Sequence, residues 1–230
     1  MKPFKSISAG SLNRTFQAVS EAWKKCDFAA ALEMMERARR LNPSNLDILM
    51  NLGRFRGLRY DYAAAAQCFE QAVRIAPRKA EALATAGQQC REFNHLAMAG
   101  RYLQRALAEK DITPAIMVKL AEIHERQRRL DDAIALVDRA LQADATCGPA
   151  LLLRAKLDRQ QGRLEMAENR LRAFPATTDP NLQAGAQYEL GNILDRQGRY
   201  DDAMAAWLKA KSLLYLLAER ARVELKVMRT

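Results

Sequence analysis

Residues 49–77 decide the fold, and they read LMNLGRFRGLRYDYAAAAQCFEQAVRIAP. The stretch alternates small and large apolar residues at helical spacing, with a polar turn near its middle. The small residues are Gly53, Ala65 and Ala72, and the large ones are Leu49, Leu52, Tyr62 and Phe69. Two antiparallel helices need this arrangement, because they approach closely only where side chains are small and fill the remaining space with bulk. The stretch therefore predicts a packed helical pair.

The same pattern returns every 34 residues. The position of Ala65 recurs at Ala31, Ala99, Ala133 and Ala167, and the position of Gly53 recurs at Gly87, Ala121 and Ala155. A period of 34 with small residues at these places is typical of helix-turn-helix repeats, and the chain resembles the tetratricopeptide repeat (TPR) family over nearly its whole length.

This resemblance implies an all-α fold, a right-handed α-solenoid of about six TPR units. We expect repeats at about 11–45, 46–79, 80–113, 114–147, 148–181 and 182–217, with the last helix running on to about residue 228. Residues 1–10 are expected to be flexible, with Ser11 as the first N-cap, so that 11–230 form a single solenoid. The sixth repeat lies two residues out of phase, because Ala203 follows Ala167 by 36. The loop containing Pro175 and Pro180 is expected to absorb this shift.

The composition narrows the functional classes. The net charge is +10, without a polybasic block, and no run of 18 apolar residues predicts a membrane span. The first residues lack the apolar region of a secretory signal, and the four cysteines lie far apart, so we expect a cytoplasmic protein with cysteines buried as small hydrophobes. The basic excess leaves three alternatives: a soluble basic surface, an acidic partner, or nucleic acid as the weakest of the three.

Catalysis has no support in the sequence. There is no GxxxxGK[ST], GxGxxG, GxSxG or HExxH motif, and no metal-ligand spacing of cysteine and histidine. His124 lies between Glu122 and Glu125, but a packed histidine in a helical pair explains it better than a catalyst does. We therefore expect a non-enzymatic protein with no cofactor and no metal.

The resemblance also implies where a partner binds, because in TPR proteins the first helix of each pair lines a concave groove. Family groove positions fall here on apolar residues edged by both signs of charge. We expect the groove to contain Met50, Arg54, Gln88, Arg91, Val118, Glu122, Arg126, Lys156, Arg159, Tyr188, Asn192 and Asp195. The carboxylate clamp of chaperone-binding TPR domains is not expected, because among the matching residues Gln17, Glu21, Asn51, Glu81 and Thr85 only Asn51 agrees.

Two functional hypotheses follow. The first is a non-catalytic scaffold that holds a peptide or protein segment in the groove. The second is the substrate-recruiting module of a larger enzyme, because the sixth repeat and its long last helix also resemble the TPR region of bacterial TPR-linked sulfotransferases, whose catalytic domain is absent from these residues. The apolar stripe of the last helix, expected to include Leu214, Leu217, Ala221, Leu225 and Met228, either caps the solenoid or docks a partner, a second copy or a downstream domain.

Overall fold

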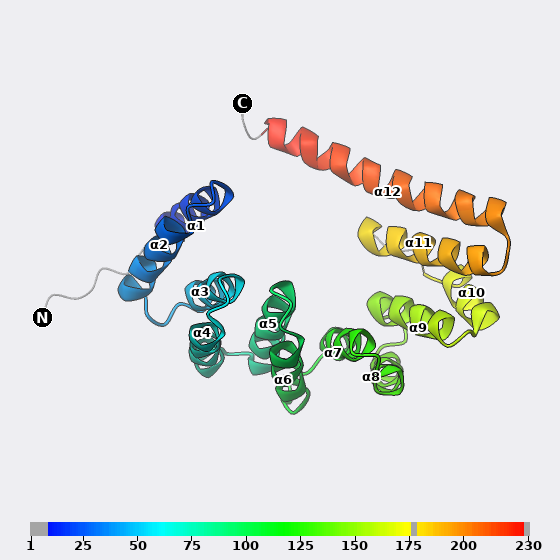
Figure 1. Ribbon diagram of the computed structural model, residues 1–230, viewed down its shortest axis with the longest axis horizontal. Helices are drawn as coiled ribbons and strands as arrows, with labels where there is room; N and C mark the ends of the chain where they lie inside the picture. Colours follow the sequence, from blue (N-terminus) through cyan, green and yellow to red (C-terminus); the bar gives the residue numbers. More distant parts are fainter. Residues whose placement is uncertain (1–8, 176–178, 228–230) are drawn as a thin grey trace, which may run out of the picture. The chain divides into compact units, whose positions relative to one another are not determined.

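A computed structural model describes residues 9–175 and 179–227, and side chains beyond residue 216 only at 218 and 219. The described residues form twelve α-helices and no strands, which confirms the all-α class (Figure 1). The chain divides into two compact units, residues 1–112 and 113–230. In each unit the helices follow one another as antiparallel pairs, so the expected helix-turn-helix repeats are confirmed.

Unit 1 holds the first three pairs and unit 2 the last three. In unit 1 the helices are α1 (Ala9–Lys24), α2 (Phe28–Leu41), α3 (Leu46–Leu58), α4 (Tyr62–Ile75), α5 (Lys79–Glu92) and α6 (Leu96–Leu107). In unit 2 they are α7 (Pro114–Arg126), α8 (Leu130–Ala143), α9 (Gly148–Gln160), α10 (Leu164–Arg172), α11 (Pro180–Arg196) and α12 (Tyr200–Val227).

Each pair turns on one residue in the left-handed region of backbone space. The φ angles are positive at Cys26, Tyr60, Asn94, Arg128 and Gly162, five positions spaced 34 residues apart, and again at Gly198, 36 residues further on. Each of these residues lies just after a first helix, where a left-handed residue lets the chain reverse and reuse the last carbonyls of the helix. The backbone therefore repeats the 34-residue period of the sequence, and also its two-residue shift.

The core of a pair forms where a small residue of the first helix meets a larger one 16 positions later. A Cβ atom placed on Gly53 would lie 2.4 Å from Phe69, one on Gly87 would lie 2.7 Å from Leu103, and one on Gly191 would lie 2.4 Å from Trp207. Where the first helix carries alanine, the partner is smaller than an aromatic ring: Val137 follows Ala121 and Leu171 follows Ala155, all four buried. A small residue on the first helix thus leaves room for a larger side chain on the second.

The prolines fall where the sequence places them, outside helix interiors. Pro114 and Pro180 are the first residues of α7 and α11, where a missing N–H costs nothing. The helix α10 has only 9 residues and ends before Pro175, which confirms the early end of repeat five. Across the next turn, Asp179 caps α11 by accepting a hydrogen bond from the Asn181 N–H at 2.9 Å. Residues 176–178 lie outside the described part.

The long last helix is confirmed, since α12 has 28 residues. The stripe positions Leu217, Ala221, Leu225 and Met228 lie outside the residues whose side chains the structure describes. None of the helices in the described residues is both long and apolar enough to cross a membrane.

Two local expectations are wrong. α1 begins at Ala9, so Ser11 lies inside the helix and is not its N-cap. Cys26 is exposed, while Cys68, Cys90 and Cys147 are buried as expected. Cys26 is exposed because it occupies the left-handed turn rather than a helix face.

The substitution Gly53→Ala distinguishes the effect of helix packing on stability from the effect of helix propensity. Alanine is the better helix former by about 1 kcal/mol, so propensity alone predicts a more stable protein. The added methyl would instead push against the Phe69 ring, and we expect a net loss of about 1–3 kcal/mol in the free energy of unfolding. Urea denaturation followed by circular dichroism measures the change. An increase in stability would mean that the two helices are not in close contact at this point.

Candidate functional site

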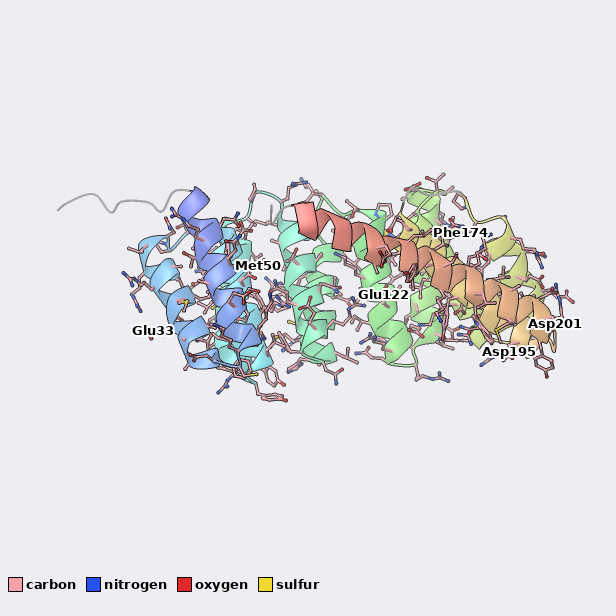
Figure 2. All side chains as sticks on the ribbon, turned by 90° about the horizontal axis from the view of Figure 1, so that it is seen from above. Glu33, Met50, Glu122, Phe174, Asp195 and Asp201 are labelled. Carbon is pink, nitrogen blue, oxygen red and sulfur yellow. The ribbon has the colours of Figure 1, made fainter. Side chains whose placement is uncertain are left out.

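The predicted groove residues lie on the first helices of the repeats. In unit 1 these are α3 and α5, which contact each other directly, and in unit 2 they are α7, α9 and α11, which contact in succession. Figure 2 shows Met50, Glu122 and Asp195 at their places on these helices. Met50 and Val118 are only 5% and 3% exposed. Both side chains are therefore mostly covered, although Met50 still lines a hollow of unit 1.

In unit 1 a hollow of about 320 Å³ opens between α3 and α5. Its lining combines short polar side chains with a few apolar ones: Leu46, Asp47, Met50, Asn51, Pro77, Arg78, Glu81, Ala82, Thr85 and Gln89. The Asn51 amide donates to the Asp47 carbonyl at 2.9 Å, and the Thr85 hydroxyl donates to the Glu81 carbonyl at the same distance. The Gln89 Oε1 atom is buried and has no hydrogen-bond partner in the described part of the chain.

The predicted cations of unit 1 do not all stand free. The Arg54 Nε atom donates to Glu92 Oε2 at 2.7 Å, and both side chains are about 40% exposed. This pair joins α3 to α5. Gln88 and Arg91, two further predicted residues, are half-buried on α5.

In unit 2 two of the three predicted cations, Lys156 and Arg159, bind carboxylates of a neighbouring repeat. Lys156 Nζ on α9 lies 3.1 Å from Glu125 Oε1 on α7. Arg159 Nε, also on α9, donates to Glu189 Oε1 on α11 at 2.5 Å, and both side chains are mostly buried. Burial raises the pKa of Glu125, but hydrogen bonds from Gln160 and Lys156 outweigh it, so the pKa lies below its usual range. These side chains connect successive first helices.

The other predicted residues of unit 2 differ in exposure. Tyr188 is 59% exposed, and Arg126 and Asp195 are also exposed. Glu122 is half-buried. Asn192 is engaged within its own repeat, because its Oδ1 atom accepts from Trp207 Nε1 at 3.3 Å. The structure therefore brings together Lys156 and Arg159 with their acidic partners, and leaves Tyr188, Arg126 and Asp195 at the surface.

Sequence reasoning missed the most buried charge of the chain. Asp158 on α9 is 0% exposed and its carboxylate accepts hydrogen bonds from three arginines. Arg163 Nη2 lies 2.7 Å from Oδ1, Arg170 Nε lies 2.8 Å from Oδ2, and Arg154 donates to Oδ1 as well. Arg154 also donates to Asp138 at 2.7 Å, which ties α9 to α8. The cluster braces the shortened repeat five.

A signal for this cluster exists in the 34-residue register. Asp158 occupies the place of His124 in repeat four, of Cys90 in repeat three and of Arg56 in repeat two. The first helix faces its partner at this place, so a carboxylate there requires cations close by.

At the equivalent place in repeat four, His124 is only 7% exposed. Its Nδ1 atom has no hydrogen-bond partner among the described residues. Burial lowers the pKa of His124, and the nearby charge of Arg129 lowers it further. A neutral imidazole packed in the pair agrees with the expectation of a structural histidine. Among the described residues no group of histidine, cysteine or carboxylate side chains could hold a metal ion.

Replacing Asp158 by asparagine keeps the shape and removes the charge that holds three arginines. We expect the free energy of unfolding of unit 2 to fall by about 2–4 kcal/mol, because buried cations lose their counter-charge. Trp207 lies in unit 2, so its fluorescence in a Trp23→Phe background reports this transition during urea denaturation. Asp144→Asn, at an exposed carboxylate bonded only to Thr146, is the control and should change stability by less than about 0.5 kcal/mol. Equal effects of the two substitutions would contradict the role of the cluster.

Comparison with solved structures supports the same architecture. The chain is similar to PilW, a widely conserved type IV pilus biogenesis factor, at 22% identity over 84% of this chain and 89% of that one, with a TM-score of 0.57. It is similar to YrrB, described as a TPR protein with an unusual peptide-binding site, at 17% identity over 82% and 97%, with a TM-score of 0.51. A mutant of IFIT1 solved with Gppp-AAAA gives 18% identity over 80% and 45%, with a TM-score of 0.63.

These identities establish the fold alone, and no curated protein sequence matches the chain. The resemblance to TPR-linked sulfotransferases is not shown by these matches. The family model for the tetratricopeptide repeat matches residues 16–80, 91–146 and 152–211, which is well over half of the chain. Together with the helix pairs and their 34-residue register, this match shows that the chain belongs to the tetratricopeptide repeat family.

Proposed function

We propose that the chain is a non-catalytic protein–protein interaction scaffold, and that it holds an extended segment of its partner in the hollow between α3 and α5. One observation carries the proposal: a hollow of about 320 Å³ opens between these two helices, lined by short polar side chains such as Asn51 and Thr85. Polar side chains beside an apolar surface suit a peptide segment, because its backbone groups need hydrogen-bond partners. Met50 supplies an apolar wall beside these polar side chains.

The charges around the hollow favour a neutral polar segment over an acidic one. Its lining includes two carboxylates, Asp47 and Glu81, and one cation, Arg78. Arg78 Nε already lies 3.0 Å from Glu81 Oε2. Just beyond the hollow, Arg54 binds Glu92. The basic excess of the chain therefore gives an acidic partner little to bind on this face, although the net charge is +10.

The fold alone does not choose the ligand, because function depends on the site rather than on the scaffold. YrrB is described by a peptide-binding site, whereas IFIT1 was solved with a capped oligonucleotide. A nucleic-acid site needs a row of cations that contact phosphates. In unit 2 the predicted groove cations Lys156 and Arg159 are instead paired with Glu125 and Glu189. This pairing supports a peptide ligand over an RNA.

Selection from a random peptide library on the immobilised full chain tests the proposal. Enriched peptides would be synthesised, labelled and titrated by fluorescence anisotropy. Thr85→Tyr fills the hollow and should reduce affinity at least tenfold, and Gln89→Leu removes a polar side chain from its lining and should reduce it by about 3- to 10-fold. Arg101→Ala, an exposed substitution on α6, should leave affinity unchanged. The proposal fails if no peptide is enriched, or if peptides bind the Thr85→Tyr protein as tightly as the wild type.

A further inference from the structure

The second helices α2, α4, α8 and α10 contact the following repeat through their first, fifth or ninth residues. In unit 1, Arg59 of repeat two lies over the ring of Phe28, with its guanidinium carbon 5.4 Å from the centroid. Tyr62 stacks on Phe93 of repeat three with centroids 5.7 Å apart, and Glu70 accepts from Arg105 of repeat three at 3.0 Å. Phe28 and Tyr62 are first residues of α2 and α4, and Glu70 is the ninth residue of α4.

In unit 2 the fifth and ninth residues of second helices also contact the next repeat. Asp138, the ninth residue of α8, binds Arg154 of repeat five at 2.7 Å. Glu168, the fifth residue of α10, binds Arg199 of repeat six at 2.9 Å. First, fifth and ninth residues of a second helix are therefore the docking positions for the next repeat.

In α12 the docking positions are all large and apolar, and they face solvent. Tyr200, Met204 and Leu208 are the first, fifth and ninth residues of α12, and they are 69%, 54% and 56% exposed. The last repeat of a solenoid ordinarily carries a polar outer face, because nothing covers it. A stripe of three large apolar side chains at the positions that elsewhere hold the next repeat instead marks an interaction surface.

The first repeat carries a hollow that could receive this stripe. A hollow of about 410 Å³ lies between α1 and α2, lined by Arg14, Thr15, Ala18, Met34, Arg37, Ala38 and Leu41. Met34 and Arg37 lie 68 residues before Tyr102 and Arg105, which are two of the residues of repeat three that contact α4. Tyr102 donates to the carbonyl of Ala66, the fifth residue of α4, at 3.5 Å. The hollow is thus the place where the second helix of a preceding repeat would lie.

We propose that the chain self-associates head to tail, with the α12 stripe of one copy seated in the α1–α2 hollow of the next. By the internal register, Met204 and Leu208 of one copy would meet Met34 and Arg37 of the other. Charge is complementary, because the exposed Asp201 and Asp202 flank the stripe and Arg14 and Arg37 line the hollow; Asp202 also accepts from Arg199 at 2.7 Å. A heterologous contact of this kind builds chains of copies rather than closed two-fold dimers. The inference is independent of the proposed peptide site.

Sedimentation equilibrium of the full chain over a concentration series tests the proposal. We expect the average mass to rise above 25.9 kDa with concentration and without a plateau at the dimer. Met204→Glu on the stripe and Met34→Glu in the hollow should each lower the association constant at least tenfold, because a charge would be buried against an apolar side chain in the contact. Met166→Glu, at a residue 47% exposed elsewhere in unit 2, is the matched control and should leave association unchanged.

Mixing the two variants distinguishes a head-to-tail contact from a contact between two α12 helices. The Met204→Glu chain keeps an intact hollow and the Met34→Glu chain keeps an intact stripe, so together they should form a one-to-one dimer that grows no further. Circular dichroism would confirm that each variant is folded, and Met204→Ala with Leu208→Ala replaces the glutamate variant if that one is not. A monomer at every concentration overturns the proposal. So does association that survives Met34→Glu but not Met204→Glu, because it would mean that two α12 helices pair with each other.

Discussion

The structure depends on the close approach of two helices at one point in each repeat. At Gly53, Gly87 and Gly191 the first helix comes so near the second that a Cβ atom would lie within 2.4 to 2.7 Å of the side chain opposite. Close packing of this kind is what lets a pair of short helices bury a continuous apolar face. Because the meeting residue lies 16 positions later in the sequence, the contact is local, and each repeat can form it without help from distant parts of the chain.

Polar contacts then connect neighbouring repeats within each unit. Glu92, Glu125 and Glu189 on first helices bind cations from the first helix of an adjacent repeat. Second helices add pairs such as Glu70 with Arg105 and Glu168 with Arg199. Exposed pairs of this kind contribute little to stability one by one. Their consequence is functional, since cations that already hold a carboxylate of the chain are less available to a ligand, and the hollow between α3 and α5 is left nearly neutral.

Most of the fold follows from the sequence because the same pattern of small and large residues occurs in several repeats. The alternation of Gly53 with Phe69, and of Ala121 with Val137, predicts which helices meet and where, and Pro175 with Pro180 predicts the shortened fifth repeat. The candidate site follows only in part. Family positions correctly place the predicted residues on first helices, but they do not show that Met50 and Val118 are covered or that Arg159 is paired. Those outcomes depend on the separation of adjacent first helices, which no single repeat encodes.

Two features needed the coordinates for a different reason. Asp158 stands in a register position that holds Arg56, Cys90 and His124 in other repeats, and its partners Arg163 and Arg170 come from the turn and the next helix. The register indicates that cations are needed there, but only the folded pair shows which ones. The sequence of α12 likewise does not by itself indicate that its exposed stripe is an interaction surface. Its meaning comes from comparing Tyr200, Met204 and Leu208 with the positions that hold the next repeat elsewhere in the same chain.

The central claim is that each repeat is a module whose contacts depend only on its neighbours in the 34-residue register. Deleting residues 46–79 removes one full period and joins Asn45 to Ala80, so the docking positions of repeat one meet those of repeat three. The account predicts that this shortened chain keeps the mean residue ellipticity of the full chain at 222 nm and unfolds cooperatively on heating. A deletion of the same repeat that is two residues longer, 44–79, puts the helices out of register and should lose helicity. If both deletions behave alike, whether folded or unfolded, the register does not hold the repeats together and the account is contradicted.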